Sequence, residues 1–292
     1  MRGDGDGWAV GPDGEKRWGR HGAAGLLLRA PLADGRPAVL LQHRAAWSHQ
    51  GGTWALPGGA RDSHESTVDA AVREAHEEAG IDVEAVTVRA ERVTSGLAGG
   101  WTYTTVVADA TETLVTSLNQ ESTELRWVPE PDVETMPLHS GFAEAWPLLR
   151  TSPVRMLLDT ANVLGASGPT GWWRDRPGAT DALLADLAAA LPRTVEFPDG
   201  SFGWVPRVEA VLEGHARDAT IDDVRIPVHT ADGSGDDELA RLAAIATAVV
   251  DPGVTVVVDP GVTVVVTADR GLRARLPEGT IAMSPSAVLG WL

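Results

Sequence analysis

The chain of 292 residues contains no cysteine. This absence excludes disulfide bonds and thiolate metal sites, and it fits the reducing cytoplasm. No uninterrupted apolar run approaches the roughly 18 residues that a membrane span needs, and the polar, glycine-rich N-terminus is unlike a signal peptide. We therefore expect a cytoplasmic protein without a membrane partner.

Positive charge is also scarce. The chain has 24 Lys and Arg against 41 Asp and Glu, a formal net charge of −17, and Lys16 is its single lysine. Both halves share the acidic excess, so neither has the basic surface typical of nucleic-acid binding. At 43% hydrophobic and 22% charged residues, the chain can nevertheless form packed cores, and its length suits one large or two ordinary domains.

The first half is predicted to contain two parts: a flexible leader at residues 1–21 and a domain over residues 22–152. Apolar and β-branched patterns predict strands at 22–30, 36–44, 86–93, 101–111 and 124–129, and helices at 66–79 and 139–150. Thr151-Ser152-Pro153 is a plausible junction. This order of elements predicts a mixed α/β domain.

The second half, residues 153–292, alternates strands with helices. Strands are predicted at 154–159, 208–216, 224–230 and 262–267, and helices at 179–192 and 236–250, with a last strand and helix near the C-terminus. Such alternation is typical of a doubly wound parallel sheet. The whole chain is therefore assigned to the α/β class.

Three glutamates stand close together on the predicted helix of the first half. Glu74, Glu77 and Glu78 occupy positions i, i+3 and i+4, where like charges repel on one helix face. Such a face suits hard divalent cations, Mg²⁺ above all, which bind diphosphate oxygens and lower the pKa of an attacking water. The alternative is a solvated acidic surface, as most glutamate runs are.

The surrounding residues fit the pattern G-x5-E-x7-R-E-U-x-E-E-x-G-U, where U is a bulky aliphatic residue. The matching positions are Gly59, Glu65, Arg73, Glu74, Glu77, Glu78, Gly80 and Ile81. This stretch resembles the Nudix box, and the resemblance covers roughly residues 20–150. It implies an α/β/α sandwich and a Mg²⁺-dependent pyrophosphohydrolase. Ala75 departs from the first U position, which should affect packing rather than chemistry.

The resemblance also implies roles for single residues. Glu74, Glu77 and Glu78 would ligate Mg²⁺, or Mn²⁺ as the alternative, with help from the Gly59 carbonyl. The pair Glu65–Arg73 and the helix stop at Gly80 would be structural. A carboxylate outside the box often completes the metal site or acts as the base. Glu121 is favoured over Glu124, because its distance before Trp127 resembles that of the MutT type; the alternative is that both are exposed loop carboxylates.

The substrate class is predicted from the absence of two sequence features that mark other substrate classes of the family. The stretch SGLAGGW (95–101) lacks the proline of ADP-ribose hydrolases, and Tyr103 lies too far along for the dinucleoside polyphosphate type. These absences leave a MutT-like (d)NTP or a related nucleotide derivative. Trp54, Trp101 and Trp127 are candidates to stack on a base, although tryptophan more often serves in packing.

Acidic residues also follow the predicted strands of the second half. Asp159, Asn162, the pair Asp236 and Asp237, and Asp269 come from three segments whose ends should meet at one edge of a parallel sheet. Aspartate is common at strand ends and helix N-caps, which is the alternative. Together the residues resemble the NYN/PIN-like nucleases over residues 154–292.

That second resemblance implies a metal site at Asp159, Asp237 and Asp269, with Asn162 beside it and Asp236 as a substitute for Asp237. A further acid on the intervening helix is missing, unless Asp175 or Asp186 serves. The chain is thus predicted to be a Nudix hydrolase of a nucleotide substrate, with a metal-dependent ribonuclease as a second activity. The alternative is a Nudix module that senses a nucleotide and regulates an RNA-processing domain. The acidic charge disfavours RNA as a partner, and the oligomeric state is not predicted.

The segment DPGVTVVV occurs twice in tandem, at 251–258 and 259–266. The second copy is predicted to be the strand that leads to Asp269. Pro-Gly turns fit hairpins poorly, and Pro260 cannot donate in a ladder. The first copy is therefore predicted to form an exposed loop or irregular extension away from the acids.

Overall fold

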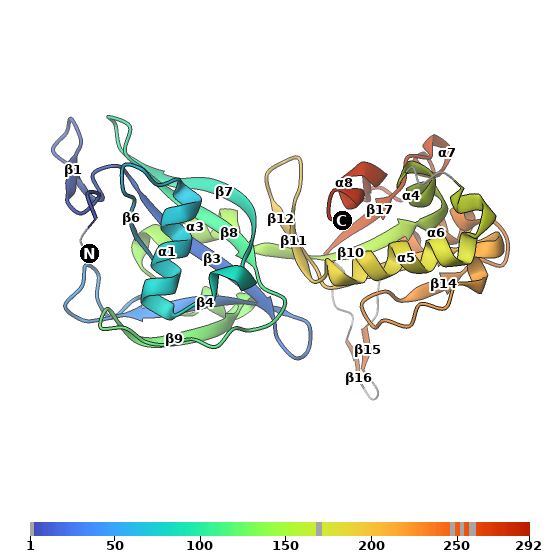
Figure 1. The fold of residues 1–292 in the computed structure, drawn as a ribbon, viewed down its shortest axis with the longest axis horizontal. Coiled ribbons are helices and arrows are strands. Elements are labelled where there is room, and N and C mark those ends of the chain that lie inside the picture. The colour runs from blue at the N-terminus through green and yellow to red at the C-terminus, as the bar shows by residue number, and fades with distance from the viewer. Residues whose placement is uncertain (1–2, 168–170, 246–248, 252–253, 257–260) are drawn as a thin grey trace. The chain divides into compact units, whose positions relative to one another are not determined.

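The computed structural model describes residues 3–167, 171–245, 249–251, 254–256 and 261–292 (Figure 1). The chain divides into two compact units. Unit 1 consists of the residues up to Thr151 together with Thr194–Phe202, and unit 2 consists of Ser152–Arg193 and Gly203–Leu292. The prediction placed a single division at residue 152 and did not anticipate the second segment of unit 1.

The N-terminal segment differs from the flexible leader that the sequence led us to expect. It contains the antiparallel strands β1 (Trp8–Val10) and β2 (Lys16–Trp18), on which the Trp8 and Trp18 rings lie edge to face at 5.4 Å. The Asp4 carboxylate accepts a hydrogen bond from the Ser63 backbone N–H at 2.9 Å. The segment is therefore held against the loop that precedes the glutamate helix.

Unit 1 is built on a mixed sheet whose main strands match the five predicted ones. These are β3 (Ala23–Pro31), β4 (Pro37–Arg44), β7 (Thr87–Gly96), β8 (Thr102–Asp109) and β9 (Ser122–Pro129), with the short strands β5 (Trp54–Ala55) and β6 (Gly58–Ala60). The order is β5-β4-β3-β8-β7, with β6 beside β3 and β9 beside β4. The pair β3–β8 is parallel and the other described pairs are antiparallel.

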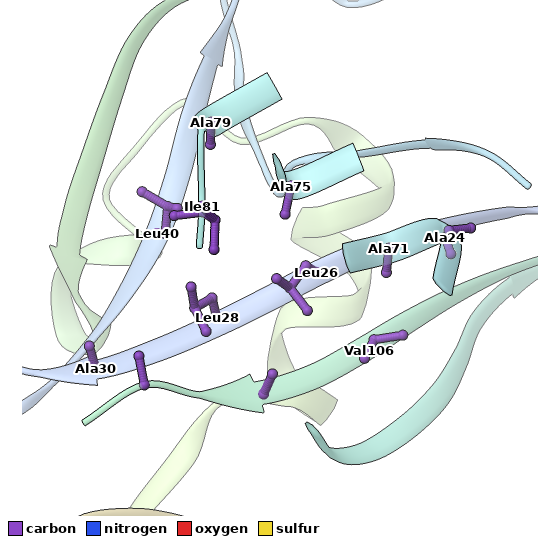
Figure 2. Close-up of a cluster of buried hydrophobic side chains, with 13 residues drawn as sticks. Ala24, Leu26, Leu28, Ala30, Leu40, Ala71, Ala75, Ala79, Ile81 and Val106 are labelled. Atoms are coloured by element: carbon purple, nitrogen blue, oxygen red, sulfur yellow. The ribbon is translucent and has the colours of Figure 1, made fainter. Parts of the chain in front are cut away.

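Helices cover both faces of this sheet. On one face, alanines of α1 (Thr67–Ala79) pack against Leu26 and Leu28 of β3, and these short side chains let the helix lie close to the strands (Figure 2). On the other face, Phe142 and Trp146 of α3 (Ser140–Leu149) pack against Leu27. The short helices are η1 (Val83–Ala85) and α2 (Glu130–Val133). Unit 1 is thus a three-layered α/β/α sandwich.

Residues 194–202 complete the core of unit 1. They lie in the strands β11 (Arg193–Glu196) and β12 (Phe202–Val205) and the turn between them. Phe202 is 1% exposed and belongs to the α3-side core, with the Arg92 guanidinium 5.1 Å from its ring. Buried Asp109 accepts hydrogen bonds from the Thr194 N–H and hydroxyl, both at 2.6 Å. This segment therefore supplies both apolar and polar partners that residues up to 151 lack.

Unit 2 contains parallel strands in the order β14-β13-β10-β17-β18. Their bounds are β10 (Thr151–Asp159), β13 (Val208–Leu212), β14 (Val228–Thr230), β17 (Val262–Val266) and β18 (Ile281–Met283). Relative to their order in the chain, the five parallel strands run 3-2-1-4-5, so β10 is central and its last residue lies between two neighbours.

The connections of unit 2 are helical. The helices are α4 (Thr160–Ser167), η2 (Trp172–Arg174), α5 (Arg176–Ala189), η3 (Gly214–Asp218), α6 (Gly235–Ala244), α7 (Arg270–Arg273) and α8 (Pro285–Leu289). Leu239 of α6 and Leu272 of α7 pack against Leu157 of β10. The helix predicted over 236–250 was too long, because Val249–Asp251 form a strand, β15. Across the described residues, no helix has the length and apolar character of a membrane span.

The two copies of DPGVTVVV have different structures. The second copy supplies β17, the strand that leads to Asp269, as predicted, and β17 lies beside β10. From the first copy, Asp251 ends β15, and β16 (Val254–Val256) pairs with β15 in a separate antiparallel sheet. The prediction of an irregular extension was therefore wrong for these residues, while 252–253 and 257–260 lie outside the described residues.

Deleting eight residues from this repeat should leave the fold intact. Removal of either copy yields the same sequence, so the remaining copy can always supply β17. We expect the deletion to change the melting temperature by no more than about 2 °C. In contrast, Val265→Ala in buried β17 should lower the free energy of unfolding by about 2 kcal/mol. Thermal unfolding measures both. A collapse on deletion comparable to that of Val265→Ala would show that the β15–β16 pair is part of the core.

Candidate active site

The glutamate helix α1 has well-defined ends. Ser66 caps its N-terminus and forms a capping box with Asp69, while Gly80 ends it in the left-handed conformation with a φ of 67°. The predicted helix over 66–79 and its stop at Gly80 are confirmed. These caps fix which residues of α1 face β3 and which face the backbone of β6.

The three glutamates differ in exposure. Glu78 is 5% exposed, the Glu74 side chain is 15% exposed and that of Glu77 is 58% exposed. Ala75, the departure from the motif, is fully buried in the face of α1 that packs on β3 (Figure 2). The short side chain at position 75 thus belongs to the alanine face of the helix and does not disturb the carboxylates.

Glu78 is a buried carboxylate held through one oxygen. Its Oε2 accepts hydrogen bonds from the Gly58 N–H at 2.8 Å and the Gln42 Nε2 at 2.9 Å. Burial raises the pKa of Glu78 to about 8, and the charges of Glu74 and Glu121 act in the same direction. No Arg or Lys forms an ion pair with Glu78 among the described residues.

Glu74 lies against the backbone of β6. A Cβ on Gly59 would sit 2.5 Å from Glu74 Oε1, so only glycine allows this approach. Arg73 donates to the same Oε1 at 2.8 Å. Burial nevertheless raises the pKa of Glu74, against the opposing effect of Arg73.

Arg73 and Glu65 form a two-pronged ion pair. Arg73 Nε and Nη2 bond the two Glu65 oxygens at 2.6 and 2.9 Å, and Nη2 also donates to the Ala60 carbonyl at 3.0 Å. The hydrogen bonds from Arg73 hold the pKa of Glu65 below its ordinary value. This geometry ties the loop after β6 to α1, as a structural pair would.

The two carboxylates outside the box have different surroundings. Burial is the main cause of the raised pKa values of Glu74 and Glu78, and the charge of Glu121 acts on both in the same direction, which places Glu121 near them. Glu124 instead forms an ion pair with Arg126, with Arg126 Nε 2.9 Å from Glu124 Oε1. Glu121 is therefore the carboxylate that the structure brings to the group on α1.

Two buried polar residues beside Glu78 were missed by the sequence reasoning. Gln42 interrupts the apolar strand β4, and Ser122 begins β9 directly after Glu121. The sequence reasoning also did not place Tyr103 near Glu78. The Tyr103 hydroxyl lies over Gly25 and Gly58, and burial and the charge of Glu78 raise the pKa of Tyr103. A polar residue inside an apolar strand was the available signal for Gln42.

The predicted stacking tryptophans mainly serve the fold. Trp54 is 6% exposed in the α3-side core, and Arg126 and His43 lie near its ring. The indole N–H groups of Trp101 and Trp127 donate to the carbonyls of Gly19 and Leu114 at 2.8 and 3.1 Å. These contacts match the packing alternative.

The raised pKa of Glu78 predicts a pH-dependent stability. Its ordinary value is 4.5, so the stability that protonated Glu78 contributes is complete below about pH 4.5 and is lost as the pH rises through about 8. Glu78→Gln stays neutral throughout. Without divalent cations, the variant should gain on the wild type across this window by on the order of a few kcal/mol. Urea unfolding in EDTA measures the difference; parallel stability profiles would contradict the raised pKa.

The carboxyl ends of the unit 2 strands gather a second set of acids. Asp159 ends β10, is 8% exposed, and accepts hydrogen bonds from the Thr267 hydroxyl at 2.7 Å and the Asn162 N–H at 3.0 Å. Burial raises its pKa, and the charges of Asp236 and Glu213 add to this. Burial likewise raises the pKa of Asp236, with the charges of Asp269 and Glu213 as further causes.

This set differs from the predicted one in two members. Asp237 lies in an exposed ion pair with Arg275, so Asp236 is the residue of the pair that joins the group. Glu213, directly after β13, is the further acid that the sequence reasoning missed. Asp175 caps α5 through the Gly178 N–H, and Asp186 is exposed on the same helix. A carboxylate following a buried strand was the signal for Glu213.

A compact metal-sized constellation occurs elsewhere. Within the described ranges, only Asp4, Asp62 and His64 form a group of at least three acidic or histidine side chains whose ligand atoms all lie within 4.8 Å of one another. Among the described residues, the glutamates of α1 are thus not drawn together to that degree, and neither are the acids of unit 2. Asp4 and Asp62 are already hydrogen-bonded to Ser63 and Gly5 respectively.

Unit 1 is thus a sandwich in which glutamates of α1 lie against the glycine backbone of β6, with Glu121 near them. The family model described as "NUDIX domain" matches residues 19–150. A Mycobacterium tuberculosis protein provisionally named 8-oxo-dGTP diphosphatase 3 is 52% identical over 208 residues, which cover 70% of this chain and 85% of that protein. This match is longer than the NUDIX match and so extends beyond it.

Two further relatives each match about half of this chain. A Bifidobacterium longum nucleoside triphosphate pyrophosphatase/Nudix hydrolase fusion protein is 42% identical over 148 residues, covering 49% of this chain and 30% of that protein. The crystal structure of RenU, a Nudix hydrolase of M. smegmatis, shares 63% identity over 50% of this chain and 93% of its own, with a TM-score of 0.49. The chain belongs to the Nudix family, and it is a pyrophosphohydrolase of that family.

Proposed function

We propose that unit 1 hydrolyses an oxidised purine nucleoside triphosphate, 8-oxo-dGTP, to the monophosphate and diphosphate. The observation that carries the site is the group of Glu74, Glu78 and Glu121: burial raises the pKa values of the two glutamates on α1, and the charge of Glu121 acts in the same direction. The substrate class is supported by the name of the M. tuberculosis relative, which shares 52% identity over most of its length.

The residues of the site fit a divalent cation. The described site holds four carboxylates: Glu74, Glu77, Glu78 and Glu121. The guanidinium of Arg73 bonds Glu74, but its charge is already balanced by Glu65. The ligand set is all oxygen, as Mg²⁺ and Mn²⁺ prefer, and Gly59 leaves room at its backbone. When bound, Mg²⁺ would polarise phosphorus and lower the pKa of a water.

The protein groups then have separate tasks. The Gly58 N–H holds one oxygen of Glu78, and Arg73 holds one oxygen of Glu74, so that the remaining oxygens are available as ligands. Glu121, which carries no ion pair of its own in the described structure, takes a proton from the water. The water oxygen bonds to phosphorus as the bridging P–O bond breaks, and diphosphate leaves.

A substrate panel tests this proposal on the full chain. It should contain 8-oxo-dGTP, dGTP, ADP-ribose and a dinucleoside polyphosphate, each with Mg²⁺ or Mn²⁺. The highest kcat/KM is expected for 8-oxo-dGTP. A preference for ADP-ribose or the dinucleoside polyphosphate would refute the substrate while leaving pyrophosphohydrolase chemistry intact.

A second activity is proposed for unit 2, as a metal-dependent ribonuclease of the NYN/PIN-like type. The favouring observation is the proximity of Asp159, Glu213, Asp236 and Asp269 at the carboxyl ends of parallel strands. The chain's net charge of −17 opposes strong RNA binding. Any RNA affinity should therefore be weak and sensitive to salt.

Short single-stranded RNAs with Mn²⁺ provide the test, using the Glu78→Gln chain so that nucleotide hydrolysis does not interfere. Cleavage that disappears in Asp159→Asn and persists in Asp237→Asn would support the nuclease. Cleavage that survives Asp159→Asn would exclude this site. If RNA binds without cleavage and 8-oxo-dGTP alters its affinity, unit 1 acts as a nucleotide sensor instead.

A further inference from the structure

Gln42 is a buried polar side chain without an assigned role. It lies on β4, is 1% exposed, and its backbone neighbours across the sheet are Ala55 of β5 and Leu125 of β9. A buried amide surrounded by apolar strands is costly unless its hydrogen bonds are satisfied. Its presence therefore calls for partners that use it.

Each polar atom of the Gln42 amide has such a partner. The Ser122 hydroxyl donates to Oε1 at 2.6 Å, and Nε2 donates to the Leu56 carbonyl at 3.2 Å and to Glu78 Oε2 at 2.9 Å. A flipped amide would turn its oxygen toward the Leu56 carbonyl, which only accepts, and toward Glu78, which only accepts in the ionised form that binds a cation. The surroundings thus fix the amide with its N–H groups toward Glu78.

The contact selects one oxygen of Glu78. Both donors to this carboxylate, Gln42 Nε2 and the Gly58 N–H, reach Oε2. In the described structure, no hydrogen bond from the protein reaches Oε1 of this residue, which is 5% exposed. Two donors on one oxygen restrain rotation of the carboxylate and leave the other oxygen free.

The same amide connects two carboxylates from distant segments. Ser122 directly follows Glu121, whose carbonyl accepts the Ala45 N–H at 2.8 Å at the end of β4. The chain Ser122–Gln42–Glu78 therefore links the segment that carries Glu121 to the helix that carries Glu78. Both ends of this link are buried, with Ser122 at 6% exposure.

We propose that Gln42 is a positioning residue, held by Ser122, that fixes Glu78 with Oε1 available to a divalent cation and sets its placement relative to Glu121. This inference rests on the proposed metal-dependent hydrolysis. It assigns Gln42 no contact with substrate. Ser122 acts on Glu78 only through the Gln42 amide.

The test uses Gln42→Met, which keeps the length and apolar stem and removes the donors. Mn²⁺ affinity, measured by electron paramagnetic resonance of free Mn²⁺ in the full chain, should weaken by about 10-fold or more. The kcat for 8-oxo-dGTP should fall with little change in KM. Exposed Gln50 provides the matched control: Gln50→Met should leave Mn²⁺ affinity and kcat unchanged.

Ser122→Ala separates positioning from packing. It should weaken Mn²⁺ binding less than Gln42→Met, and the double variant should be no worse than Gln42→Met alone, because Ser122 acts through the amide. A residue that only stabilises the fold would lower the unfolding midpoint and leave Mn²⁺ affinity unchanged. Additive losses in the double variant would refute the role of Ser122.

The outcomes distinguish this inference from the proposed substrate. If the wild type binds Mn²⁺ in a Glu78-dependent way but does not hydrolyse 8-oxo-dGTP, the substrate is wrong and the Gln42 result still stands. Wild-type Mn²⁺ affinity in Gln42→Met would overturn the inference. Absence of Glu78-dependent Mn²⁺ binding in the wild type would overturn it as well.

Discussion

Glu78→Gln is expected to lower kcat by at least about 100-fold, the effect of removing one preorganised charged group from a transition state. Glutamine matches the shape of protonated glutamate and can still accept from Gly58, but it brings no negative charge to the cation site. Because the variant no longer buries a carboxylate, its stability in EDTA near pH 8 should rise. Activity and stability should therefore move in opposite directions.

The matched control for this prediction is Glu124→Gln. Glu124 lies on the strand that follows Glu121, but its exposed side chain is paired with Arg126. For this surface change we expect a wild-type kcat, and a free energy of unfolding within about 0.5 kcal/mol of the wild-type value. Steady-state kinetics on 8-oxo-dGTP and urea unfolding measure both variants. Turnover by Glu78→Gln within a few-fold of the wild type would remove Glu78 from the site.

Phe202→Ala should have the largest effect on stability, a loss of about 3–5 kcal/mol from unit 1. Phe202 is 1% exposed in the core beside Trp146, and its ring lies near the guanidinium groups of Arg29 and Arg92. Truncation leaves a cavity and removes both cation–π contacts. The α1 glutamates lie on the other side of the sheet, so activity of the folded fraction should persist.

Leu148→Ala provides the comparison, because Leu148 belongs to the same unit but is 67% exposed. Its loss should cost less than about 1 kcal/mol. With two units, unfolding need not be two-state, so hydrogen exchange of α3 and β8 peptides is the suitable measurement. Equal protection in Phe202→Ala and wild type would show that residues 194–202 do not support unit 1.

The sequence allowed the core of the Nudix half to be predicted because its signals are local. The caps Ser66 and Gly80 bound α1, and the spacing of Glu74 and Glu78 fixes their shared face. The preference for Glu121 over Glu124 came from a resemblance and not from spacing alone. Which of them approaches α1 depends on how β9 begins, and that is a property of the folded sheet.

Other features depend on contacts between distant segments. The hydrogen bonds between Thr194 and Asp109 join residues that are 85 apart in the chain, so no local sequence pattern predicts them. The orientation of Gln42 depends on the register of β4 against β9. The alanine- and valine-rich run after Ala244 suits a helix or a strand, and Val249–Asp251 form a strand that pairs locally with β16.

Unit 1 is discontinuous in the chain, and this bears on its synthesis. A ribosome releases Asp109 and Arg92 long before Thr194 and Phe202, with α4 and α5 of unit 2 emerging in between. Until then, Asp109 of the nascent unit 1 lacks the two hydrogen bonds from Thr194, and the core of unit 1 lacks the ring of Phe202. Final closure of the first unit is thus coupled to translation of the second, and a chain cut at residue 152 would remain in the unfinished state.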